Sequence, residues 1–183
     1  MKFAPLALCA VLAACASSPD TLVRVAAPPL SERISIGHAS LLVRTVSLPT
    51  YAASEEIHRQ GADGALTSSP TLRWADEPER AITLELSRAL AELTRARVAP
   101  DPWPFGSDPG AEIDVRIEDL LAGSDGALLL SGQYFVSSES GRERSGIFRL
   151  TVPLAPEAGA GDIAKARGEA VQQLARQIAR TAL

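Results

Sequence analysis

Residues 113–118, Ile-Asp-Val-Arg-Ile-Glu, decide the fold class because apolar and charged side chains alternate along them. A period of two residues places one face of a β-strand in the core and the other face in water. Two further apolar segments, 128–136 and 146–152, follow after the polar stretches 123–126 and 137–144. Three consecutive strands with short connections predict an antiparallel meander.

Two amphipathic helices are predicted beside this meander. The first is expected over 79–93, with Asp76 as an acidic cap, Pro78 in the first turn and Glu79 three residues after the cap. The second is expected to begin at Asp162. Their apolar stripes, at helical spacing, are Ile82, Leu86, Ala89, Leu90 and Leu93 in the first helix and Ile163, Ala166, Ala170, Leu174 and Ile178 in the second. The predicted fold class is α+β, with both helices packed on one face of an antiparallel sheet.

Two more strand signals precede the first helix. Residues 41–48 are rich in leucine and valine and stop at Pro49, which has no N–H for a strand ladder. Residues 55–60 and 65–68 flank the sequence Gly-Ala-Asp-Gly at 61–64, which predicts a hairpin.

The beginning of the chain has the pattern of a bacterial lipoprotein signal. Lys2 provides positive charge, 3–11 form an apolar run, and Leu12-Ala13-Ala14-Cys15 matches a lipobox. The apolar run is too short to cross a hydrocarbon core of about 30 Å. We expect cleavage before Cys15 and acylation of its thiol, the alternative being an ordinary secretory signal with a chance cysteine. Because Ala16 rather than Asp follows the cysteine, we expect sorting to the periplasmic face of the outer membrane.

The chain is therefore predicted to have three parts. Residues 1–14 are a signal peptide, 15–40 are the lipidated N-terminus with a flexible tether, and 41–183 are a single α+β domain. Within the tether, 22–25 is compatible with a first strand, whereas 26–35 contains Pro28-Pro29 and is typical of a linker.

Candidate catalytic and metal-binding residues are few. His38 and His58 have no cysteine or acidic residue at metal-ligand spacing. Asp108 and Glu112 are a possible acid and base, although acidic residues beside a proline-rich loop are usually exposed. With Cys15 acylated, the mature chain has no free thiolate, and no Gly-x-Ser-x-Gly elbow occurs. We expect no enzyme activity, no metal and no cofactor besides the covalent lipid, and the formal net charge of −4 argues against a nucleic-acid partner.

The two tryptophans have different expected roles. Trp74 lies directly before the first helix and is expected to cap the core. Trp103 lies in Pro-Trp-Pro-Phe, close to Phe105, where a core cap and the anchor of a protein interface are equally good interpretations. Trp103 and Phe105 are therefore the candidate partner interface.

The order of motifs resembles that of PqiC-type lipoproteins, the ABC-type transport auxiliary lipoprotein components. The motifs that carry this resemblance are the lipobox, Val46-Ser47-Leu48-Pro49-x-Tyr51, Glu55 to Arg59, Leu72-Arg73-Trp74-Ala75, the following helix, the segment Val98 to Trp103, and an alanine-rich terminal helix.

The resemblance implies a non-enzymatic accessory subunit of an MCE-type system that moves lipids between the two membranes. Its partners would be the outer membrane, a periplasmic MCE-domain protein and, indirectly, an inner-membrane ABC or permease component. A ring-shaped partner would favour a homo-oligomer. A lipoprotein chaperone or assembly plug of another outer-membrane machine fits the same anchor, and an envelope hydrolase fits less well.

Overall fold

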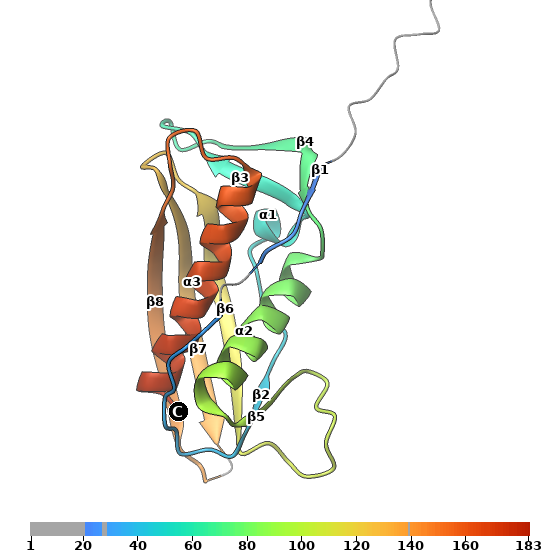
Figure 1. The fold of residues 1–183 in the computed structure, drawn as a ribbon, viewed down its shortest axis with the longest axis vertical. Coiled ribbons are helices and arrows are strands. Elements are labelled where there is room, and N and C mark those ends of the chain that lie inside the picture. Colours follow the sequence, from blue (N-terminus) through green and yellow to red (C-terminus); the bar gives the residue numbers. More distant parts are fainter. Residues whose placement is uncertain (1–20, 27–28, 139) are drawn as a thin grey trace, which may run out of the picture.

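The predicted meander is present and forms the longest part of the sheet (Figure 1). The computed structural model describes residues 21–26, 29–138 and 140–183. In it β6 (Ala111–Ala122), β7 (Ala127–Ser138) and β8 (Glu143–Pro153) pair antiparallel in chain order. The alternation of apolar and charged residues in β6 places them on opposite faces, as predicted. Ile113, Val115 and Ile117 are buried, and the charged residues between them lie on the open face.

A bulge interrupts the pairing of β6 with β7 between Ile117 and Asp119. Gly132, which pairs with Ile117, has a φ of 155°, and a Cβ there would lie 2.1 Å from the carbonyl oxygen of Arg116. Glycine is thus required where the two backbones approach most closely.

The sheet as a whole is mixed, so the prediction of a purely antiparallel sheet is wrong. It has eight strands, and β2 (Ser40–Val43) pairs parallel with both β6 and β5 (Arg97–Pro100). A leucine- and valine-rich segment indicates a strand but not the direction of its neighbours. The parallel pairing of β2 with β5 is possible because one long connection, which contains two helices and two strands, separates them in the sequence.

The strand predicted over 41–48 is shorter than expected. β2 ends at Val43, and beyond it only Ser47 forms an isolated bridge, to Arg116. Val46 N–H donates instead to the Thr83 hydroxyl at 3.0 Å. Pro49 then caps the short helix α1 (Thr50–Ala53).

The predicted hairpin is confirmed. β3 (Glu56–Gln60) pairs antiparallel with β4 (Leu66–Trp74), and Gly61 N–H donates to Ala65 O at 2.8 Å. The outer edge of β4 pairs in parallel with β1 (Thr21–Val23), the first described strand.

The described part of the expected tether packs on the body. Leu30 is buried, Ile34 and Ile36 pack against the core, and Ile34 N–H donates to Leu93 O at 2.8 Å. The interpretation of this stretch as a linker is wrong, because its apolar side chains pack on the core and are thereby removed from water. Residues 15–20 lie outside the described residues.

Both long helices lie on the same face of the sheet, as predicted (Figure 1). They are α2 (Pro78–Thr94) and α3 (Ala160–Thr181), and every residue of the two predicted apolar stripes is buried. Asp162 accepts from Gly159 N–H at 2.9 Å as an N3 capping residue. For α2 the cap is Glu77 rather than Asp76, whose carboxylate accepts from Glu77 N–H. None of the described helices is long and apolar enough to cross a bilayer.

Candidate docking surface

The candidate interface residues lie in the loop 101–110, which joins β5 to β6. Its two ends are attached to β2, because Asp101 N–H donates to Val43 O at 2.9 Å and Gly110 N–H to the Ser40 hydroxyl at 3.0 Å. Between these attachments the loop projects from the body (Figure 1). A projecting loop fixed at both ends can present side chains to a partner without disturbing the sheet.

Trp103 and Phe105 form one aromatic cluster with Arg97, which we call the Trp103 cluster. The two rings pack edge to face with centroids 4.8 Å apart. The Arg97 guanidinium lies 5.0 Å from the Phe105 ring centroid, and Trp103 Nε1 donates to Ser107 O at 2.6 Å. Phe105 remains 40% exposed. Trp103 is half-buried and Phe105 is exposed, and both lie in the projecting loop. The assignment of the two residues to a partner interface stays a prediction.

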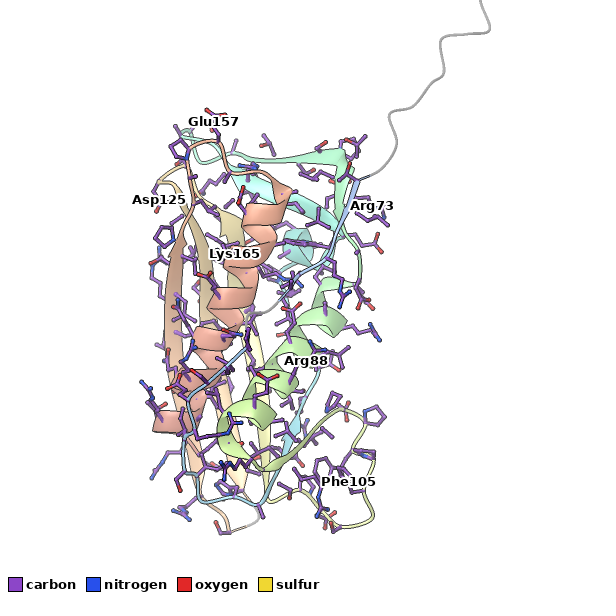
Figure 2. The ribbon with its side chains drawn as sticks, in the orientation of Figure 1. Arg73, Arg88, Phe105, Asp125, Glu157 and Lys165 are labelled. Atoms are coloured by element: carbon purple, nitrogen blue, oxygen red, sulfur yellow. The ribbon has the colours of Figure 1, made fainter. Side chains whose placement is uncertain are left out.

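The Trp103 cluster and β1 lie at opposite ends of the molecule. Phe105 is at the lower end in Figure 2, whereas Arg73, whose strand pairs with β1, is at the upper end. The chain segment that leads back to the lipobox therefore joins the body far from this loop.

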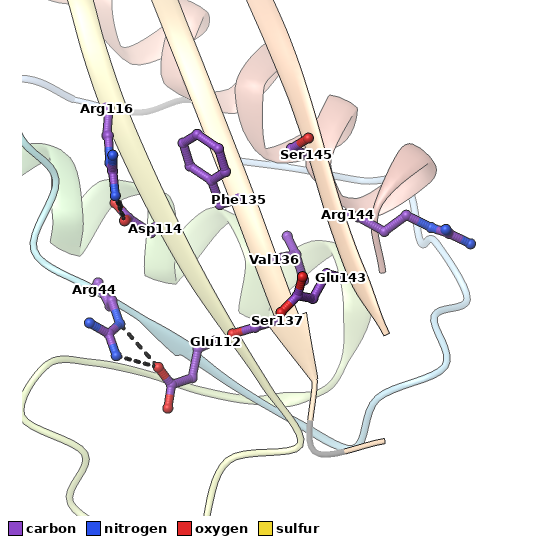
Figure 3. A pocket seen from close by; sticks show the side chains of 10 residues that line it. All are labelled: Arg44, Glu112, Asp114, Arg116, Phe135, Val136, Ser137, Glu143, Arg144 and Ser145. Carbon is purple, nitrogen blue, oxygen red and sulfur yellow. Dashed lines mark hydrogen bonds and ion pairs between the residues drawn. The ribbon is translucent and has the colours of Figure 1, made fainter. Parts of the chain in front are cut away.

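A second feature is a cavity of about 430 Å³ on the open face of the meander (Figure 3). Arg44 donates to the Glu112 carboxylate through Nε and Nη2, at 3.0 and 2.7 Å. Arg116 pairs with Asp114 at 2.9 Å, and its guanidinium lies 4.9 Å from the Phe135 ring centroid. The open face is thus a row of paired charges around one aromatic ring.

Arg44 and Glu112 are engaged with each other in this cavity. The Glu112 carboxylate holds the pKa of Arg44 above its usual value through their hydrogen bonds and Coulombic attraction. Both donors reach the same oxygen of Glu112, Oε2, so the ion pair occupies this oxygen. The lining also has no histidine or cysteine beside its two serines, Ser137 and Ser145.

The other candidate residues stay apart. His58 lies on β3 with its ring edge-on to Tyr51, and Nδ1 lies 3.1 Å from Glu56 O. His38 lies in the segment before β2 and lines a different cavity, with arginines. Asp108 is exposed in the loop. Across the described residues no group of three or more His, Cys, Asp or Glu side chains is placed to hold a metal ion. Cys15 and Ala16 lie outside the described residues.

Three charged contacts could not be predicted from the sequence. Arg44 pairs with Glu112 across 68 residues, Arg97 packs on Phe105, and Arg167 pairs with Glu85 across 82 residues. No periodicity or spacing links the partners, since each contact depends on how strands and helices are placed in space.

The model of the ABC-type transport auxiliary lipoprotein component family matches residues 21–179. A crystal structure of an uncharacterised protein is 23% identical, with a TM-score of 0.68 over 81% of this chain and 98% of that one. Protein XCC0632 from Xanthomonas campestris is 15% identical, with a TM-score of 0.68 over 86% of this chain and 92% of that one. No curated protein matches the chain.

The two crystal structures support the fold alone at these identities. The family match, in contrast, covers nearly all of the described residues and agrees with the resemblance seen in the motifs. This chain belongs to the ABC-type transport auxiliary lipoprotein components.

Proposed function

We propose that this auxiliary lipoprotein is anchored through Cys15 in the periplasmic face of the outer membrane and docks an MCE-type intermembrane lipid transport system there. It acts without catalysis. Its partners are a periplasmic MCE-domain protein and, through that protein, an inner-membrane ABC or permease component. The lipobox, the alanine at position 16 and the family support this role.

The position of the Trp103 cluster carries the proposal. Tryptophan and arginine are enriched at the energetic centres of protein interfaces, and this cluster projects from the end opposite to β1. With the lipid at one end, the aromatic loop faces away from the membrane, where a protein that crosses the periplasm would arrive.

Site-specific photo-crosslinking in native envelopes tests this role. A photoreactive amino acid is placed at Phe105 and, as a control, at Leu66, which is also apolar and 40% exposed but lies in the β3–β4 hairpin at the other end. We expect an MCE-domain protein to be captured from position 105 and not from position 66.

Two outcomes would contradict the proposal. Capture of an outer-membrane assembly protein from position 105 would support the chaperone or plug alternative. Equal capture of the MCE-domain protein from both positions would show that the Trp103 cluster is not the docking surface.

A further inference from the structure

A second, smaller cavity lies between β1, the end of β4 and the two long helices. It measures about 140 Å³, and we call it the arginine pocket after Arg24, Arg88 and Arg167, which line it together with Trp74 and Glu85. Arg88 lies midway along α2 in Figure 2, so this pocket is distinct from the Trp103 cluster.

Arg167 is the most unusual residue of the pocket. Although its side chain is only 2% exposed, Nη2 donates to Glu85 Oε1 at 2.6 Å and the guanidinium packs 4.3 Å from the Trp74 ring centroid. Nε and Nη1 of Arg167 and Oε2 of Glu85 are buried without a hydrogen-bond partner among the described residues. Buried donors without an acceptor are unfavourable, and such groups in native proteins usually serve a ligand or a bound water.

The rim of the pocket adds two more guanidinium groups. Arg24 and Arg88 are exposed, and neither donates a hydrogen bond to another described residue. The nearby Asp76 is already paired with Arg80. The pocket therefore holds three arginines and one further carboxylate, that of Glu85, which pairs with Arg167. Burial raises the pKa of the Glu85 carboxyl. The excess charge is at least two positive units.

We propose that the arginine pocket binds a phosphate group in the form of a monoester. The doubly charged phosphate matches the excess positive charge, and guanidinium forks bind phosphate oxygens in pairs. Arg24 and Arg88 hold the outer oxygens at the rim, Arg167 supplies donors at the base, and the Trp74 ring forms an apolar wall. This binding site is separate from the proposed docking surface, so either can fail without the other.

Titration of the mature lipoprotein in a neutral detergent tests the site. Inorganic phosphate is the first probe, measured by calorimetry and by the Nε–H resonance of Arg167. We expect saturable binding and a shift of that resonance, with Arg24→Gln and Arg88→Gln each weakening binding about tenfold, which corresponds to about 1.4 kcal/mol. Arg149→Gln is the matched control because Arg149 is also exposed but lies on β8.

A second pair of probes identifies the source of the phosphate. Glycerol 3-phosphate and short-chain phosphatidic acid carry the same headgroup, and only the second has acyl chains. Tighter binding of phosphatidic acid would assign the site to a lipid headgroup, and equal binding would assign it to a soluble ester. Absence of saturable binding at millimolar phosphate, or equal weakening by Arg149→Gln, would overturn the proposal.

Discussion

At the scale of single residues, the Arg167–Glu85 pair is the most consequential contact of the structure. The side chains are 2% and 14% exposed, so both charges are largely removed from water. Desolvation of such a pair offsets much of its attraction, whereas loss of one partner leaves the other charge buried and uncompensated. The packing of Arg167 on Trp74 adds a contact that does not depend on Glu85.

We therefore expect Arg167→Met to lower the free energy of unfolding by about 3–5 kcal/mol. The double variant Arg167→Met with Glu85→Leu should recover most of this loss, because no buried charge remains. Urea unfolding of the wild type, both single variants and the double variant gives the coupling energy. A double variant no more stable than Arg167→Met would show that the loss does not come from an uncompensated charge on Glu85.

The pKa of Glu85 predicts a pH dependence of stability. Burial raises this pKa above its ordinary value, against the opposing effect of Arg167. The folded state therefore favours the protonated carboxyl of Glu85. Its contribution to the free energy of unfolding is complete when the pH is below the pKa that Glu85 has in the unfolded chain. This contribution is lost as the pH rises through the pKa that Glu85 has in the folded protein. Glu85→Gln, which cannot ionise, should abolish this dependence.

The measurement is the difference in unfolding free energy between wild type and Glu85→Gln from about pH 4 to about pH 8. We expect the wild type to lose stability relative to the variant over this range. If the wild type instead gained stability relative to Glu85→Gln as the pH rose, the attraction of Arg167 for the Glu85 carboxylate would outweigh the cost of removing that carboxylate from water.

Among the helices and strands, those whose apolar side chains recur at a regular spacing could be predicted from the sequence. The pairing of strands that are distant in the sequence could not. The alternation at 113–118 and the stripes of α2 and α3 identify the meander and both helices, because burial on one face leaves a direct trace in the sequence. The parallel pairing of β2 with β5 and β6 leaves no such trace. The same limit applies to the candidate site, where Trp103 and Phe105 were found from composition but their partner Arg97 was not.

The apolar stripe of α2 is expected to contribute strongly to the stability of the fold. Leu86 and Leu90 are fully buried, so Leu86→Ala or Leu90→Ala should lower the free energy of unfolding by about 2–5 kcal/mol. Asp108→Ala is the control, with an expected change within about 0.5 kcal/mol because Asp108 is exposed in a loop. Denaturant unfolding checks both. A loss of docking by Asp108→Ala with normal stability would reveal a functional site in this loop that is not aromatic.

At the scale of the whole molecule, the packed segment after Thr21 limits how far the body can move from its proposed anchor. From Cys15 to Thr21 the chain has six residue steps, which reach about 20 Å when fully extended. Since β1 pairs with β4 and the segment 29–40 lies on the core, the chain adds little further reach. The proposed anchor would therefore keep the β1 end near the membrane and leave the Trp103 cluster on the far side.

If the proposed role is right, function depends on which membrane holds the lipid. Ala16→Asp should retain the acylated protein at the inner membrane, with the fold unchanged because position 16 precedes the first described strand. The docking end would then face its partner from the wrong side of the periplasm, so we expect the phenotype of a deletion in a detergent-sensitivity assay. Density-gradient separation of the two membranes measures the location, and Cys15→Ala, which should release the protein from both, is the control. An Ala16→Asp protein that stays in the inner membrane yet complements the deletion would show that outer-membrane anchoring is not needed for docking.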